Sequence, residues 1–424
     1  MASSDLILLR SSAPGLPGPY LQENLAAYRV LDDIKVTFPH FVMAIGGHVK
    51  DRLLGVKSPT DAAVTLRDMH PGTILIDCNL HRRPLCSAPR IKGGPIPGHY
   101  RYHLLQRGEK DASQVALAVY SEVLAPFSDC IVVFLADFGG TPQAARFLAK
   151  WIAIISNHSY ASHSRLLVVT SESSHWDESL FKFLLSVELL SLLRLDTSNA
   201  LWTLAGVKSL ISRHADLFFL PDIHDVYGSI QTEAQRGATQ RAALGAKYSA
   251  VHTKSLLQDA IGHLVRGSNI AFNPILSSRL HNPVPSRMVD HILEVARVSR
   301  SVRDSIGLVA SALAMNAFPP RMHHFLPECV FETLYLGQLR ECALVLNDCD
   351  YAEGVGRDFV QGSEAELKLQ TLLENNMLIL SFARSNFDAG LYASPLPGLH
   401  LHNITPCKPG YVTQTVQLSH MPGT

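Results

Sequence analysis

The chain has 424 residues, of which 47% are hydrophobic and 17% are charged. This length exceeds what one hydrophobic core usually organises, so we expect two or three domains with large buried cores. Lysine plus arginine and aspartate plus glutamate number 37 each, and a chain without an excess of basic residues gives no electrostatic case for a nucleic-acid partner or an anionic membrane face.

Residues 1–29 are interpreted as an N-terminal extension, because their apolar stretch of four residues follows an acid and does not fit a signal peptide. The longest apolar candidate, residues 179–195, is interrupted by Lys182 and Glu188. It falls short of the roughly 20 apolar residues that span a bilayer, so we interpret it as a buried amphipathic helix and expect no transmembrane segment. Seven cysteines at scattered spacings fit a reducing compartment, and the predicted location is the cytoplasm.

Five apolar runs of strand length follow between residues 30 and 225. They are HFVMAIGG (40–47), GTILIDC (72–78), CIVVFLAD (130–137), SRLLVVTSE (164–172) and ADLFFLPD (215–222). Runs without polar alternation are typical of parallel strands that are covered on both faces. Stretches with helical spacing lie between the runs, at 112–124, 142–156 and 174–195. The alternation predicts an α/β domain over residues 30–225 with a doubly wound, mainly parallel sheet.

The third run leads into Gly139, Gly140 and Thr141 and then into helical spacing. A strand, a turn of small residues and a helix N-terminus are the parts of a phosphate-binding loop. The pattern G-x-x-x-x-G-K-[ST] fits in one register only, in which Phe134 replaces the first glycine and Gly140 replaces the lysine. Without that lysine the loop lacks its full positive charge, and Asp137 adds a negative charge beside it.

Three interpretations of this loop remain open. It is an ordinary strand-to-helix turn of an α/β sheet, a degenerate nucleotide-binding loop that is structural or binds weakly, or the loop of a working NTPase. A nucleotide with Mg²⁺ would be the cofactor under the last two interpretations, and the sequence does not identify it further.

The remaining candidate binding residues stand at strand ends. An acid that holds Mg²⁺ opposite such a loop is expected at the end of an apolar strand, and Asp77, Glu172 and Asp222 all qualify. Glu172 is the first choice because its strand follows the loop directly. Arg82 and Arg83 follow the strand at 72–78, and ligands of α/β sheets bind at the carboxyl ends of strands. We therefore predict that these arginines face the same crevice as Gly139 and Gly140.

No catalytic residue and no metal ligand is assigned. The sequence contains neither a G-x-S-x-G elbow nor a D-G-G-G loop. The segment from Cys78 to Cys86 includes His81 but lacks the paired Cys spacing of a zinc site.

Residues 226–392 are predicted to form a mostly helical domain. Helix formers dominate residues 229–318, with strong helical spacing in RMVDHILEVARVSRSVRD and SIGLVASALAMNAF. Pro319 and Pro320 end the second helix. Residues 393–424 are rich in Pro, Gly and His and are predicted to form an irregular tail.

Residues 308–335, LVASALAMNAFPPRMHHFLPECVFETLY, resemble a segment of large fungal proteins that carry a patatin-like phospholipase domain further along. The shared order is a Ser-Ala-Leu helix, a Pro-Pro-x-Met-His element, a Phe-x-Pro and a Val-Phe-x-x-Leu-Tyr helix. Its residues here are Ser311, Ala312, Leu313, Pro319, Pro320, Met322, His323, Phe325, Pro327, Val330, Phe331, Leu334 and Tyr335. The VVFLADFGG junction is also similar to one in those proteins.

The resemblance covers about residues 40–345 and implies the amino-terminal accessory region of those proteins. Their lipid hydrolysis belongs to a downstream serine-aspartate domain, so we expect a detached or truncated accessory half without phospholipase activity. The leading prediction is an accessory or regulatory interaction module, non-catalytic or weakly nucleotide-binding, whose helical domain contacts protein partners such as a patatin-type lipase. The alternative is an NTPase with an atypical phosphate-binding loop, in which Arg82, Arg83 or Lys150 replaces the missing lysine.

Overall fold

The structure is a computed structural model, and it describes residues 5–10, 20–56, 62–80, 99–105, 112–156, 164–170, 176–196, 203–220, 225–267, 272–318, 325–364 and 367. Structural statements below concern these residues. The predicted tail, residues 393–424, lies outside them.

Nine strands form one sheet in the order β6-β2-β1-β4-β5-β3-β7-β8-β9. The five predicted runs form its parallel part: β5 (Thr73–Asn79), β3 (His40–Gly46), β7 (Cys130–Phe134), β8 (Ser164–Val169) and β9 (Ala215–Leu220). The prediction of an α/β chain is confirmed.

The other four strands pair antiparallel, so the sheet is mixed. They are β1 (Asp5–Arg10), β2 (Tyr20–Asn24), β4 (Ala62–His70) and β6 (Tyr100–Leu104). The sequence analysis had assigned residues 1–29 to an extension, but the short apolar stretch there is the centre of β1. Leu6, Ile7, Leu8 and Leu9 are all buried, because β1 lies between β2 and β4 inside the sheet.

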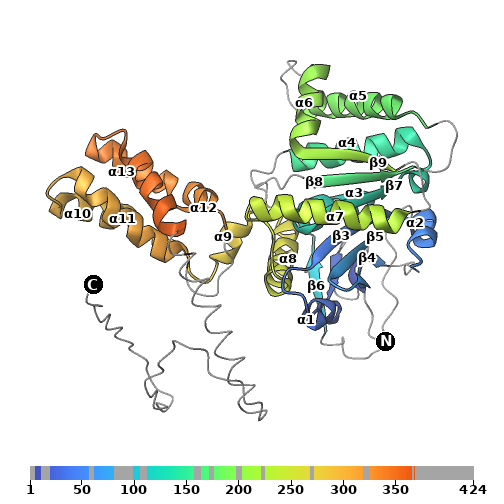
Figure 1. Cartoon of the computed structure of the whole chain (residues 1–424), viewed down its shortest axis with the longest axis horizontal. Coiled ribbons are helices and arrows are strands. Elements are labelled where there is room, and N and C mark those ends of the chain that lie inside the picture. The colour runs from blue at the N-terminus through green and yellow to red at the C-terminus, as the bar shows by residue number, and fades with distance from the viewer. Residues whose placement is uncertain are drawn as a thin grey trace, which may run out of the picture. The chain divides into compact units, whose positions relative to one another are not determined.

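Helices cover both faces of the parallel strands. The helices before residue 226 are a 3-10 turn (Leu25–Tyr28), α1 (Arg29–Asp33), α2 (His48–Leu53), α3 (Ala112–Ala118) with its continuation Val119–Phe127, a second 3-10 turn (Leu135–Phe138), α4 (Thr141–Ile155), α5 (Glu178–Asp196) and α6 (Leu204–His214). Alternate residues of β3 enter two apolar clusters: Met43 lies with Leu148 of α4, and Ala44 lies with Ile230 of α7 (Val226–Ala243). Figure 1 shows α7 crossing in front of β3 and β5.

The later residues are helical, as the sequence predicts. They form α8 (Ala250–Val265), α9 (Pro274–Ser278), α10 (Met288–Val298), α11 (Val302–Ala317), α12 (Pro327–Leu334) and α13 (Leu336–Leu346), and residues 351–364 are also helical. The predicted boundary at residue 226 differs from the structure, because α7 closes the second apolar cluster of the sheet through Val226, Ile230 and Ala234.

Helix α5 contains most of the long apolar run that was interpreted as a buried amphipathic helix. One of its faces is buried through Phe181, Leu185 and Leu189, whereas Phe183 and Val187 are exposed. Its solvent face is therefore less polar than that interpretation expects. Among the helices of the described ranges, none combines the length and apolar character that crossing a membrane requires.

A buried ionic cluster holds the segment after α7 against the amino end of β7. The carboxylate of Asp129 accepts hydrogen bonds from Phe41 N at 2.8 Å and from Lys247 Nζ at 2.5 Å. Arg241 Nε lies 3.4 Å from the other oxygen of this carboxylate. His40 lies at the edge of the cluster, with Nδ1 3.9 Å from Asp129 Oδ2.

We expect stability to fall more in the wild type than in His40→Gln as the pH drops below about 6.5. Burial first, and then the charge of Lys247, lower the pKa of His40 in the folded state. These two effects outweigh the negative charge of Asp129, which raises this pKa. The unfolded chain therefore binds more protons than the folded chain between the lowered pKa and the ordinary value, so stability rises with pH in that window. Urea unfolding at about pH 5.5 and about pH 7.5 measures this difference, and equal losses in both proteins would contradict it.

Candidate functional site

The candidate site lies at the carboxyl ends of β3 and β7. The chain leaves β3 towards β5 by way of α2 and β4, and it leaves β7 towards β8 by way of α4. Two neighbouring parallel strands whose connections diverge create the crevice in which α/β sheets bind ligands. The predicted loop is therefore at the expected place in the sheet.

The loop residues Gly139, Gly140 and Thr141 form the turn before α4. Gly139 and Gly140 have positive φ angles of 86° and 128°, which favour glycine, and Thr141 is the first residue of the helix. A Cβ atom on Gly139 would meet no other atom within 4 Å. The first turn of α4 contains no acid, so this turn is open and has the positive end of a helix behind it.

Asp137 is turned away from that opening and towards α2. Its carboxylate accepts hydrogen bonds from Val49 N and Lys50 N, both at 2.9 Å, and the residue is buried. A Cβ atom on Gly46 would lie 2.7 Å from Asp137 Oδ2, so glycine permits this approach. The carboxylate thus occupies the position that an anion takes at a helix N-terminus.

The sequence analysis did not identify Lys50, whose side chain is completely buried at this edge. Its Nζ forms a short ion pair with Asp77, donates to Asn79 Oδ1 at 2.9 Å and to the Cys78 carbonyl at 3.2 Å, and lies 3.5 Å from Asp51. The signal in the sequence is a strand followed by Gly46-Gly47-His48-Val49-Lys50. This is the order of strand, small residues and lysine that the analysis sought only after β7.

The charges of this Lys50–Asp77 cluster are compensated within the protein. Asp77, one of the three acids considered for Mg²⁺, also accepts a hydrogen bond from Thr65 Oγ1 at 3.2 Å and lies 3.4 Å from Arg67 Nε. The lysine therefore pairs with a protein carboxylate. Glu172, Arg82, Arg83 and Asp222 lie outside the described residues, so the structure does not place them relative to this cluster.

The groups beside the cluster are held in their neutral forms. Burial raises the pKa of the Cys78 thiol well above its ordinary value, and it does the same for the phenol of Tyr120. The hydroxyl of Tyr120 donates to the Asn79 carbonyl at 2.5 Å. Neither group is an activated nucleophile. Within the described part of the chain, no group of three or more His, Cys, Asp or Glu could hold a metal ion.

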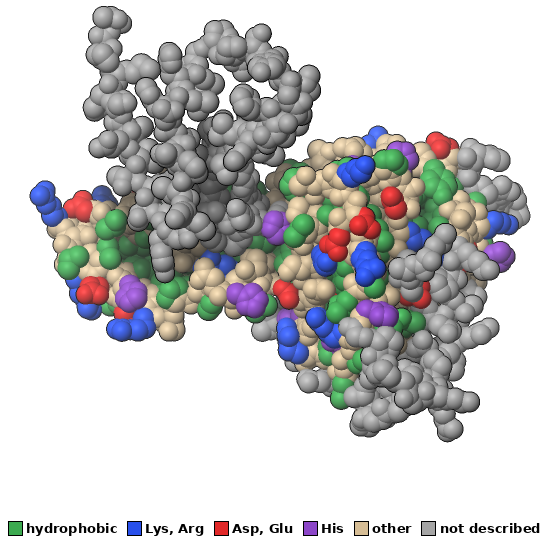
Figure 2. Space-filling view, turned by 90° about the horizontal axis from the view of Figure 1, so that it is seen from below, with side chains coloured by type: hydrophobic (Ala, Val, Ile, Leu, Met, Phe, Trp, Pro, Cys, Tyr) green, Lys and Arg blue, Asp and Glu red, His purple; other side chains and the backbone are tan. Residues whose placement is uncertain are grey.

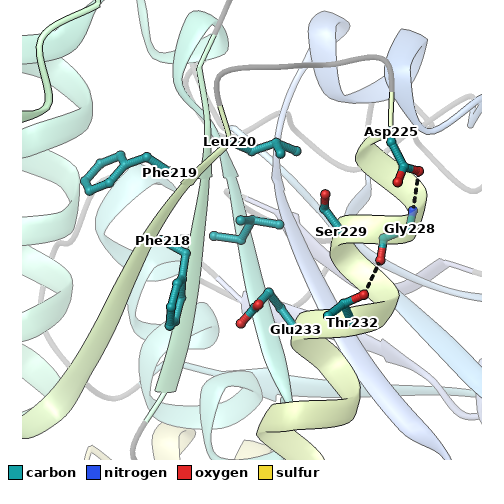
Figure 3. A pocket seen from close by; sticks show the side chains of 9 residues that line it. Phe218, Phe219, Leu220, Asp225, Gly228, Ser229, Thr232 and Glu233 are labelled. Atoms are coloured by element: carbon teal, nitrogen blue, oxygen red, sulfur yellow. Dashed lines mark hydrogen bonds between the residues drawn. The ribbon is translucent and has the colours of Figure 1, made fainter.

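A second hollow, with a volume of about 350 Å³, lies between α7 and the strands β8 and β9 (Figure 3). Its two carboxylates already have partners. Glu233 pairs with Arg165 at 2.7 Å and Arg236 at 2.6 Å, and Asp225 accepts a hydrogen bond from Gly228 N at 3.0 Å. The hollow is lined by Leu167, Phe218, Phe219, Leu220, Asp225, Gly228, Ser229, Thr232 and Glu233. The sequence analysis placed no site residue here.

Compared with known proteins, the chain matches no protein-family model and no curated protein. The resemblance of residues 308–335 to the accessory region of patatin-like proteins therefore stays a prediction from the motif residues. In the structure, Ser311 to Leu313 belong to α11 and Val330 to Leu334 belong to α12. Pro319, Pro320, Met322 and His323 lie outside the described residues.

Proposed function

We propose that the chain is an accessory or regulatory interaction module that does not turn over nucleotides. In this proposal the α/β half retains the strand, glycine turn and helix of a degenerate phosphate-binding loop, without the lysine of the motif. One observation carries the proposal: at the ligand-binding edge of the sheet, Asp137 occupies the N-terminus of α2, and Lys50 is paired with Asp77.

A phosphate at α2 would have to displace these internal partners. Removing one partner of a buried ion pair typically costs about 3–5 kcal/mol, because the remaining charge is left without compensation. A cost of this size lowers an affinity by roughly a hundredfold to a few thousandfold. The arrangement therefore supports a structural role for the cluster over nucleotide turnover.

The alternative is an NTPase that uses the open turn at Gly139 to Thr141. It is favoured by the exposed turn and by the absence of acids from the first turn of α4. Lys150, one candidate for the missing cation, follows Thr141 by nine positions in α4. It therefore lies about 13 Å along the helix axis from the phosphate position. The cation of this alternative would have to be Arg82 or Arg83.

The partner under this proposal is a protein, with a patatin-type lipase as the first candidate, and the compartment is the cytoplasm. Exposed apolar side chains on the helical half support protein contacts, with Leu308 and Met315 on α11 exposed by 62% and 67%. Figure 2 shows acidic and basic side chains interspersed with apolar ones on one face, which supports a protein over a nucleic-acid partner.

The proposal predicts that ATP, GTP, ADP and GDP leave the thermal midpoint unchanged, with or without Mg²⁺. A nucleotide that binds only the folded state adds about 2.7 kcal/mol at a hundredfold excess over its Kd, which a thermal scan detects. The matched variant is Gly140→Asp, which places a negative charge at the open turn. A rise that requires Mg²⁺ and disappears in Gly140→Asp would instead support the NTPase, and hydrolysis assays would follow.

A further inference from the structure

A groove on the α/β half lies between α5, α6 and the first residues of β9. Its volume is about 530 Å³, within the range of pockets that bury drug-sized ligands. Its apolar lining includes Phe183 and Leu185 of α5, Ile211 of α6 and Leu217 of β9. The groove lies outside the helical half that the proposed function assigns to partner binding.

An exposed apolar stripe on α5 borders this groove, and one of its residues, Phe183, also lines the groove. Leu180, Phe183 and Val187 are exposed by 49%, 52% and 42%, and their spacing of three and four residues places them on one side of the helix. The opposite side of α5 is buried in the protein core through residues such as Phe181 and Leu189. A helix that is apolar on its solvent side as well as its core side, next to a groove, indicates an interaction surface.

The charges at the groove favour a negatively charged partner. Lys182 pairs with Glu178 at 2.6 Å, and Asp216 pairs with Arg165 at 3.7 Å. Lys208 is exposed in α6 and has no ion pair with any other described residue. Helix α6 contains no acid that could pair with Lys208. The charge left without compensation at the rim is therefore positive.

We propose that this groove binds an acidic amphipathic helix of a partner protein. The apolar side of that helix would lie along Leu180, Phe183 and Val187 and enter the groove, while its carboxylates would face Lys208. Helices recognised in grooves use apolar anchors at positions i, i+3 or i+4 and i+7, and the stripe from Leu180 to Val187 has the same length. This inference builds on the proposed function, since it names a partner surface of an interaction module.

A selection from a random peptide library tests the groove. Displayed peptides are selected for binding to the full-length wild type alone, and single enriched peptides are then measured against the wild type and Phe183→Asp by fluorescence anisotropy. We expect enriched peptides to carry Leu, Ile, Phe or Trp at helical spacing together with Asp or Glu. We also expect Phe183→Asp to weaken them by about tenfold or more. Because Phe183 is half exposed, the variant should keep the wild-type melting temperature, which is checked in parallel.

Lys208→Glu tests the charge. It should weaken an acidic peptide and reduce the salt dependence of its binding, and replacing the peptide's acids with lysine should restore affinity for this variant. Lys35→Glu, the same change at an exposed lysine outside the groove, should leave binding unchanged.

Three outcomes would overturn the groove proposal: no binder at all, binders that ignore Phe183, or enriched peptides that are basic. Binders that ignore Phe183 would still leave an interaction module in place. A Mg²⁺-dependent nucleotide shift would overturn the proposed function and not the groove, so the two failures are distinguishable.

Discussion

Asp77→Ala is expected to lower the free energy of unfolding by about 3–5 kcal/mol, because it leaves the buried ammonium of Lys50 without its closest and only fully buried carboxylate partner among the described residues. Both side chains have an exposure of 0%, so water cannot replace the lost partner. The carbonyl of Cys78 and the amide oxygen of Asn79 still accept hydrogen bonds from Nζ, but they carry no net charge. The carboxylate of Asp51 remains 3.5 Å from Nζ, but it is 25% exposed and makes a longer contact than Asp77 does. Urea unfolding of the wild type and the variant gives the difference.

Two further variants show whether burial causes this loss. Glu178→Ala breaks the exposed pair with Lys182, whose side chains are about half exposed, and it should change stability by no more than about 0.5 kcal/mol. The double variant Lys50→Met with Asp77→Leu should recover most of the loss, because it removes both charges together. A cost below about 1 kcal/mol for Asp77→Ala would mean that the Lys50 charge is readily solvated. The main support for a non-catalytic role would then be lost.

The parallel strands could be predicted because each is an uninterrupted apolar run. Residues such as Met43 and Ala44 are buried on opposite faces of β3, and burial on both faces removes polar residues from the sequence. The antiparallel edge strand β6 lacks this signal. β6 is YRYHL and has no buried residue, since it is an edge strand held by its pairing with β2. Only the fold shows that such a segment belongs to a sheet.

The candidate site could be located from the sequence, but its internal contacts could not. The turn at Gly139 to Thr141 was predictable because strand, glycines and helix are contiguous. The contact of Asp137 with the amides of α2 joins residues 87 and 88 positions apart. A local sequence pattern gives no information on such a contact. Lys50 was missed because the analysis looked for the lysine only at the fixed spacing of the phosphate-loop motif after β7.

Gly237→Ala is expected to lower the free energy of unfolding by about 3 kcal/mol, because α7 approaches the sheet too closely for a methyl group. A Cβ atom at this position would lie 1.9 Å from the carbonyl oxygen of Asp129, which belongs to the backbone and cannot rotate away. The helix would have to move and would strain the nearby pairs of Arg165 with Glu233 and of Arg241 with Asp129. Urea or thermal unfolding of the variant measures the effect.

The control is the same substitution at a helical glycine with room for it. A Cβ atom on Gly262 of α8 would meet only the guanidinium of Arg266, at an ordinary contact distance of 3.5 Å. Alanine is the better helix former, so Gly262→Ala should raise stability by about 0.5–1 kcal/mol. A loss of stability in Gly237→Ala together with a gain in Gly262→Ala would separate the effect of packing from that of helix propensity. A gain in both would mean that α7 can withdraw from β7 at little cost, in which case the ionic cluster at Asp129 does not fix its position.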